Sequence, residues 1–264
     1  MTRNDRRVRA QSFVFHDGDL VTASGRFVAD NDGEWLDVGR GAIPLIFVPD
    51  ASPRPRSTHS VRLVGAVGSG VPTDFGPDGS KPGQITVVGA WHHGTIDVQS
   101  QSPVRLHGRP TPRWSVPPCP APPGGWPHGP ALEKLTDQVE DLLKHESVVS
   151  VADFRPSSTQ TVLVVASLDV PAVQRLLRPA LPGRVCVTHS RWTRAQIADV
   201  RGHLRTAFRA WSIDSIGESA TEAGQAVVVV TLMRVTQTVA DWADSVPDGL
   251  VDLDPSITPF GARE

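Results

Sequence analysis

Cysteine and histidine side chains are the residues of this chain best suited to nucleophilic chemistry. Cys186 stands three positions before His189 in the segment GRVCVTHS. A thiol needs a base beside it to become a nucleophile, but residues three apart on a strand point to opposite faces of a sheet. We therefore interpret Cys186 as a thiol buried in a strand. The Gly-x-Ser-x-Gly motif of serine hydrolases does not occur, so no catalytic residue is predicted.

Metal and phosphate sites are not indicated by the spacing of their usual ligands. Zinc sites cluster Cys and His, but the chain has no Cys-x-x-Cys pair, and His92-His93 fills a predicted turn. The segment VGAVGSG (64–70) lacks the following helix and the Lys-Ser/Thr pair of a phosphate loop. Paired carboxylates stand in predicted turns or at strand ends, where Asp bonds locally: Asp17/Asp19, Asp30/Asp32 and Asp252/Asp254. We therefore predict no metal and no cofactor.

Residues 194–209 have a helical period and carry the clearest binding signal. Their apolar stripe is expected to face a core: Ile197, Val200, Leu204 and Phe208. An adjacent stripe, extended by one residue before the helix, consists of Arg191, Arg194, Arg201, Arg205 and Arg209. Such guanidinium groups can bind phosphates or acidic partners. The favoured alternative is a solvated face, because the whole chain prefers Arg, with only Lys81, Lys134 and Lys144 as lysines.

Trp192 directly precedes the predicted N-cap of that helix in the segment HSRWTRAQ. A hydrophobic residue at this position packs against the first turns of the helix as a staple, which is the role we expect. The alternative is an anchor for a partner, since Trp and Arg are frequent hot-spot residues.

Aromatic and basic residues also alternate before residue 103. A barrel that binds single-stranded nucleic acid stacks bases on exposed aromatic rings in a basic groove. The candidates for such a groove are Phe27, Trp35, Arg62 and Trp91. Aromatic residues in strands more often pack in a core, so this binding is possible but not favoured.

Before the proline-rich stretch, short runs with a period of two alternate with turn sequences such as Asn31-Asp32-Gly33. They predict strands at Ser12–His16, Leu20–Ala29, Glu34–Val38, Ile43–Val48, Val61–Val67, Gln84–Trp91 and Gly94–Gln99. This number of short strands favours a small all-β barrel, and an OB-like barrel is the first choice.

Residues 103–130 hold 10 of the 24 prolines, in a core reading SVPPCPAPPGGWP. Proline fixes φ and cannot donate a ladder hydrogen bond, so we predict a semi-rigid linker here. Trp114 and Trp126 are expected to hold it against a domain face. The predicted organisation is a disordered arm (1–11), the barrel (12–102), the linker (103–130), an α+β domain (131–256) and a C-terminal tail (257–264).

The α+β domain contains a candidate repeat. Helices are predicted at 130–145, 170–180, 194–209 and 236–246, and strands at Val148–Phe154, Thr161–Ser167, Arg184–Thr188, Trp211–Ile216, Ala226–Leu232 and Leu250–Leu253. Two ββαβ units joined by helix 194–209 would share one mixed sheet with helices on one face, which has ferredoxin-like character. Chance similarity between simple β-α patterns is the alternative.

Composition and cysteine content favour a cytoplasmic protein. The chain has 39% hydrophobic and 20% charged residues, and its net charge is −2. The basic N-terminus, MTRNDRRVRA, is not followed by the apolar stretch of a secretory signal. Cys119 and Cys186 could form a disulfide, but reduced thiols in a cytosol fit better.

Four segments carry a family resemblance: RPSSTQTVLVV, PPCPAPPGGWP, SRWTRAQIADVRGHL and VPDGLVDLDPSITP. In these segments the chain resembles a family of actinobacterial two-domain proteins of unknown function. The resemblance implies a cytoplasmic bacterial protein and transfers no catalytic residue, because the family has no assigned activity.

Three functions remain open. The first is a non-catalytic binding or interaction protein with a protein partner. The second is single-stranded nucleic-acid binding by the barrel or by the arginine-rich helix. The third is an enzyme of unrecognised type with a site between the domains. No membrane partner is expected, since no apolar run approaches the ~20 residues of a membrane span, and the oligomeric state is left open.

Overall fold

The computed structural model describes residues 10–39, 57–66, 68, 71, 80–105, 115–129, 137, 140–141 and 143–262. Most of this part is β-sheet, with three α-helices, so the coarse prediction of a β-rich chain with mixed α and β structure is confirmed. The strand predicted at Ile43–Val48, Trp114 and most of the helix predicted at 130–145 lie outside the described residues.

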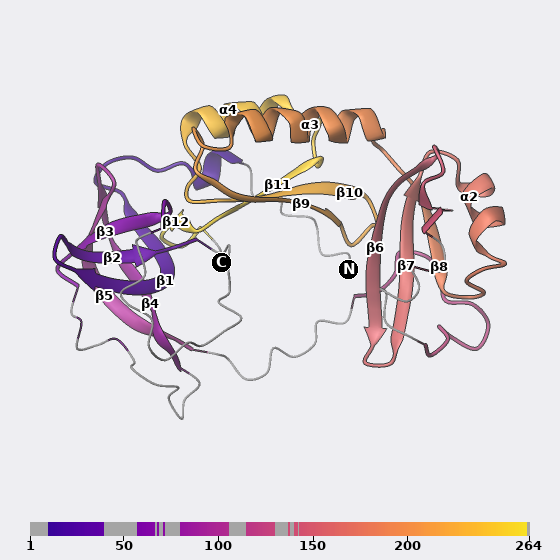
Figure 1. Cartoon of the computed structure of the whole chain (residues 1–264), viewed down its shortest axis with the longest axis horizontal. Coiled ribbons are helices and arrows are strands. Elements are labelled where there is room, and N and C mark those ends of the chain that lie inside the picture. The colour runs from indigo at the N-terminus through magenta and orange to yellow at the C-terminus, as the bar shows by residue number, and fades with distance from the viewer. Residues whose placement is uncertain are drawn as a thin grey trace.

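Five strands of the N-terminal half form a ring (Figure 1). They are β1 (Leu20–Asp30), β2 (Gly33–Asp37), β3 (Ser60–Val64), β4 (Ser80–His92) and β5 (Thr95–Arg105). The hydrogen-bonded order is β1-β2-β3-β5-β4, and β1 also pairs with β4. β3 and β5 are parallel, whereas the other neighbours are antiparallel. Leu36, Ile85 and Ile96 are fully buried inside the ring.

Two glycines allow these strands to cross closely. A Cβ atom at Gly25 would overlap the carbonyl oxygen of Asp37, and one at Gly89 would overlap that of Asp97. The pairing of β4 with β5 shifts register between Val88 and Gly89. Bulges and glycines of this kind give a sheet the bend that it needs to close.

Both ends of the described chain differ from the sequence predictions. The strand predicted at Ser12–His16 is wrong, because residues Ala10–Phe13 form the 3-10 helix η1. Phe13 is buried in the core of the C-terminal half, and the Gln11 amide donates to Asp244 at 3.0 Å. At the other end, the segment predicted as a tail begins with strand β12 (Ile257–Pro259), which pairs antiparallel with β1.

The C-terminal half contains two ββαβ units of the same connectivity. The first unit is β6 (Val148–Ser157), β7 (Gln160–Ser167), α2 (Val170–Leu177) and β8 (Val185–His189). The second is β9 (Ile213–Ala220), β10 (Ala226–Leu232), α4 (Gln237–Ser245) and β11 (Val251–Pro255). In each unit the middle strand pairs antiparallel with the first strand and parallel with the last.

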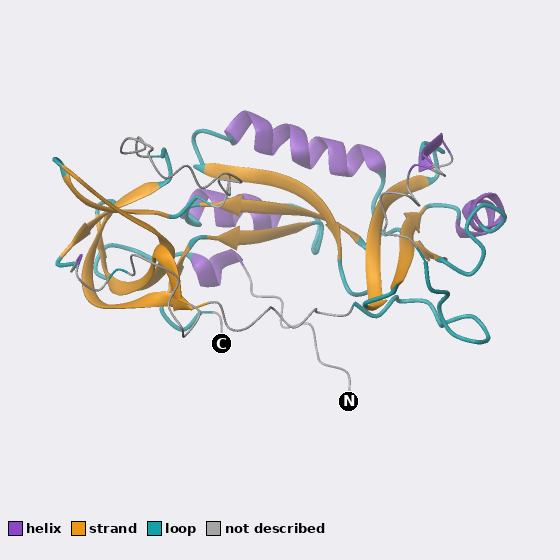
Figure 2. Ribbon diagram, turned by 60° about the horizontal axis from the view of Figure 1, so that its bottom comes forward, coloured by secondary structure: helices purple, strands orange, loops and turns teal. Residues whose placement is uncertain are grey.

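The two units do not share one mixed sheet, which corrects that prediction. Each forms a three-stranded sheet of its own, and the two sheets run in different directions (Figures 1 and 2). Helix α3 (Arg194–Ala207) joins them. It begins with a capping box, in which Thr193 Oγ1 accepts from the Gln196 amide at 3.2 Å and the Gln196 side chain accepts from the Thr193 amide.

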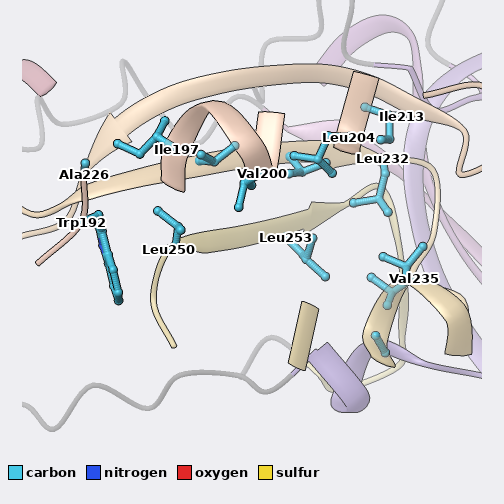
Figure 3. Packing of buried hydrophobic residues seen from close by; sticks show 14 of the residues in the cluster. Trp192, Ile197, Val200, Leu204, Ile213, Ala226, Leu232, Val235, Leu250 and Leu253 are labelled. Carbon is cyan, nitrogen blue, oxygen red and sulfur yellow. The ribbon is translucent and has the colours of Figure 1, made fainter. Parts of the chain in front are cut away.

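α3 and α4 lie on the same side of the second sheet (Figure 1). The apolar side chains of α3 share one buried cluster with alternate residues of β10, namely Ala226, Val228, Val230 and Leu232. Ala226 and Leu232 are labelled with the α3 residues in Figure 3. Val227, Val229 and Thr231 alternate with these and therefore point away from the helices. We call that side of the second sheet its helix-free face.

In the first unit, the corresponding helix-free face is covered by residues 115–129. Phe154, Val162, Val164 and Cys186 are buried there against Cys119 and Trp126. Trp126 therefore packs on a domain face, as predicted. α2 covers the opposite face, where Leu163 and Leu177 share a cluster.

Cys119 and Cys186 form a disulfide. The prediction of reduced thiols is wrong, because the proline-rich segment runs over β8 and brings the two sulfur atoms together. Disulfides persist in oxidising surroundings and are rare in a reducing cytosol. Within the described residues, no helix combines the length and the apolar character needed to cross a bilayer.

Candidate functional site

A groove of about 1010 Å³ runs along the second sheet, over part of its helix-free face and past the outer edge of β11. Its lining comes from η1, the residues before α3, the β9–β10 turn, the end of α4 and β11. The residues used below are Phe13, Arg191, Trp192, Ser219, Glu222, Gln225, Val227, Val229, Asp244, Val251, Asp252 and Leu253.

The strand register explains which side chains share the groove floor. Val227 stands opposite Ser219, and Val229 stands opposite Asp252. Directly paired residues project to the same face of a sheet, so an apolar centre on β10 is flanked by polar side chains on both neighbours. Ser219 and Asp252 are exposed, and Val229 is half-buried.

The outer edge of β11 offers backbone groups to the same groove. Leu250 accepts from the Val228 amide at 2.8 Å, and Ser256 donates to Leu232 at 2.9 Å. Residues alternate along a strand, so the amide and carbonyl groups of Val251 and Leu253 point away from β10. No other described strand pairs with this edge.

The groove is acidic. Its described lining holds the four carboxylates of Glu222, Asp244, Asp248 and Asp252 and one cation, Arg191. Asp244 accepts from Gln11. Glu222 and Asp252 have neither a hydrogen-bond partner nor an ion-pair partner within the described part of the chain.

Trp192 stands at one end of the groove and is 7% exposed. It belongs to the same buried cluster as Ile197, four residues into the helix (Figure 3). The staple between these two residues stays a prediction. The Arg191 guanidinium lies 4.9 Å from the centre of the indole ring. The indole Nε1 is buried and has no acceptor among the described residues, and an unmade hydrogen bond of this kind is costly.

Partial burial, and secondly the charge of Asp254, raise the pKa of Asp252 above its ordinary value of 3.8. The folded protein therefore holds this proton more tightly than the unfolded chain. The resulting stability is complete below the ordinary pKa and is lost as pH rises through the raised pKa. We expect Asp252→Asn to be more stable than the native protein at pH 7 and equal to it near pH 3, as measured by urea unfolding at both pH values. A neutral-pH stability at or below the native value would contradict this.

The arginines of the predicted stripe have different surroundings in the structure. Arg201 forms an ion pair with Glu218, and Arg194 donates to the Leu143 carbonyl at 3.1 Å. Arg205 and Arg209 are exposed on α3 and after it, away from the groove lining. Of the six predicted binding residues, only Arg191 and Trp192 line the groove.

The predicted barrel residues separate into two groups. Trp35 and Arg62 are direct cross-strand neighbours on β2 and β3, and they alternate with the buried Leu36 and Leu63, so they lie on the outside of the ring. Trp91 is 2% exposed and meets Phe15 edge-on at 5.4 Å. Phe27 packs against the same core. Trp91 and Phe27 are therefore core residues and do not line an outer groove.

The carboxylates of the groove were not predicted as site residues. Asp252 lies in the short strand β11, and Glu222 lies in the β9–β10 turn, so neither stands out in the sequence. The repeat contained a signal for Asp252. Asp252 pairs with Val229 as Cys186 pairs with Val164 in the first unit. Aligning the two units therefore places a carboxylate where the first unit has a cysteine. Among the residues with described positions, no group of three or more metal-ligating side chains gathers.

No protein-family model matches the chain, and no curated protein matches it. The resemblance to actinobacterial proteins therefore stays a prediction.

Proposed function

We propose that the protein is a non-catalytic interaction protein whose groove binds a segment of a partner protein. The observation that carries this proposal is the groove itself. Apolar side chains lie at its floor, Glu222 and Asp252 lie at its rim without a partner among the described residues, and the outer edge of β11 pairs with no described strand. Together these are features of a polypeptide-binding surface. The exposed Arg191 provides one of the residue types that dominate binding energy at such surfaces.

We also propose a finer description of the fold. The ring order β1-β2-β3-β5-β4, with β3 parallel to β5, supports an OB-like barrel. The matching connectivity of the two ββαβ units supports an internal duplication. The division into a barrel and an α+β domain is part of the same proposal, with η1 and β12 each packing on the half that lies farther away in sequence.

A second candidate function rests on Trp35 and Arg62. A half-buried aromatic ring beside an exposed guanidinium on the outside of a small barrel suits base stacking and phosphate contact in single-stranded nucleic acid. Trp35 Nε1 donates to Asp30 at 3.3 Å, and the nearby Asp30 and Asp37 carboxylates oppose a polyanion. Because these carboxylates repel a polyanion, we favour the groove over the barrel as the binding surface.

Site-specific photo-crosslinking tests the two candidates. With p-benzoylphenylalanine at the exposed groove residue Ser219, irradiation of host cells is expected to attach one recurrent protein. The same group at Thr206, exposed on α3, is the matched control and is expected to attach none. With the group at Trp35, a crosslink to nucleic acid would favour the second candidate. If Ser219 and Thr206 give the same products, the groove is not the binding surface.

A further inference from the structure

We infer that the groove on the second sheet binds an extended, proline-rich and basic segment of a partner protein. This inference rests on the proposed binding function and names the chemistry of the partner. It follows from comparing the two ββαβ units, because the first unit holds a segment of this kind on the matching face.

The helix-free faces of the two units correspond residue by residue. Val162 and Val164 of β7 occupy the positions that Val227 and Val229 occupy on β10, because Leu163 pairs with the first residue of β8 as Val228 pairs with the first residue of β11. In the first unit these valines are buried beneath residues 115–129. In the second unit, Val227 is 8% exposed and Val229 is half-buried, and both line the groove. The face of the first unit is thus covered by a polypeptide across both valines, whereas the equivalent face leaves Val229 partly exposed to the groove.

The segment on the first unit shows how an extended chain fits. It contains six prolines within SVPPCPAPPGGWPHG (residues 115–129). Its ends are held by backbone hydrogen bonds from Ser115 to the Arg155 carbonyl at 2.9 Å and from Gly129 to the Thr159 carbonyl at 3.2 Å. Between these ends it contacts the sheet through side chains such as Trp126. A proline-rich chain suits this arrangement, since it is extended without internal hydrogen bonds and loses little entropy on binding.

The lining of the second face selects the chemistry of the occupant. Apolar and aromatic side chains in a groove accept the rings of a polyproline helix. Glu222 and Asp252 have no cationic partner among the described residues, so Arg or Lys beside the prolines would pair with them.

Peptide binding to the full-length, disulfide-intact protein tests this inference. The probe is the fluorescein-labelled peptide Arg-Pro-Val-Pro-Pro-Arg-Pro-Val-Pro-Arg, followed by fluorescence anisotropy. Saturable binding that weakens with added salt is expected, because exposed ion pairs are screened. Two control peptides replace every Arg by Glu or every Pro by Ala, and each is expected to bind roughly tenfold more weakly or worse.

Two variants locate the binding. Val229→Arg places a long cation on the groove floor and is expected to abolish binding. Val64→Arg makes the same exchange at a residue of β3 that is 49% exposed, and it is expected to bind like the native protein. Circular dichroism and thermal melting verify that Val229→Arg folds.

The double variant Glu222→Gln/Asp252→Asn keeps the groove shape, and its affinity is expected to fall roughly tenfold with a smaller salt dependence.

The inference is overturned if the probe does not bind, if the alanine peptide binds as tightly, or if both Val→Arg variants bind alike. The test distinguishes a failure of this inference from a failure of the proposed function. If the Ser219 crosslink attaches a partner through a segment without prolines and basic residues, the groove is a binding surface and this inference is wrong. A proline-rich basic segment at that crosslink supports both.

Discussion

Removing the Cys119–Cys186 disulfide is expected to lower the free energy of unfolding by about 4 kcal/mol. The bond closes a loop across a sequence separation of 67 residues, and the conformational entropy that a crosslink removes from the unfolded chain grows with the length of that loop. In a chain of this size, the loss corresponds to a melting temperature lower by about 10 °C. Cys186 is 1% exposed, so its replacement also removes some packing.

The measurement compares the native protein with Cys119→Ala/Cys186→Ala by thermal and urea unfolding, each with and without dithiothreitol. Reductant should lower the stability of the native protein to slightly above that of the double variant, which also lacks the packing of the Cys186 side chain, and leave the variant unchanged. If dithiothreitol does not change the melting temperature of the native protein, the expected stabilisation by the disulfide is contradicted. Hydrogen exchange should rise mainly at β7 and β8, because the covering segment 115–129 is then held by non-covalent contacts alone.

Local signals in the sequence were sufficient to predict most of the helices and strands. Thr193 and Gln196 mark the start of α3 because a capping box needs only residues three apart. The run Ala226–Leu232 is apolar at every position but one, which is typical of a strand with neighbours on both edges. Elements of this kind depend on nearby residues, and they appeared in the structure within a few positions of their predicted bounds.

Features that depend on distant pairing could not be predicted in this way. Whether Cys119 meets Cys186 depends on the path of a proline-rich segment, which has no period to read. The 3-10 helix at Ala10–Phe13 exists because Phe13 finds a core built by residues near the other end of the chain. The groove has the same origin: Glu222 and Asp252 converge only after β9, β10 and β11 have taken their register.

The strand β12 is the clearest case of distant pairing. Three residues cannot show an alternating pattern, so Ile257–Pro259 had no strand signal of its own. The register nevertheless places Ile257 opposite Ala23 of β1. The Ile257 side chain is fully buried in the cluster that contains Val21, Ile85 and Trp91. The stability of the N-terminal ring therefore depends on a residue near the C-terminus.

Ile257→Ala is accordingly expected to lower the free energy of unfolding by about 2–5 kcal/mol, as for other large-to-small changes in a core that cannot collapse around the cavity. The matched control is Phe260→Ala, because Phe260 follows β12 directly but is 60% exposed; surface changes of this kind stay within about 0.5 kcal/mol. Hydrogen exchange measured by mass spectrometry should show faster exchange in β1 and β4 for Ile257→Ala and native rates for Phe260→Ala. If Ile257 belonged to a tail without a role in the ring, both variants would exchange like the native protein. Slow exchange in β1 for Ile257→Ala would therefore mean that the ring closes without β12.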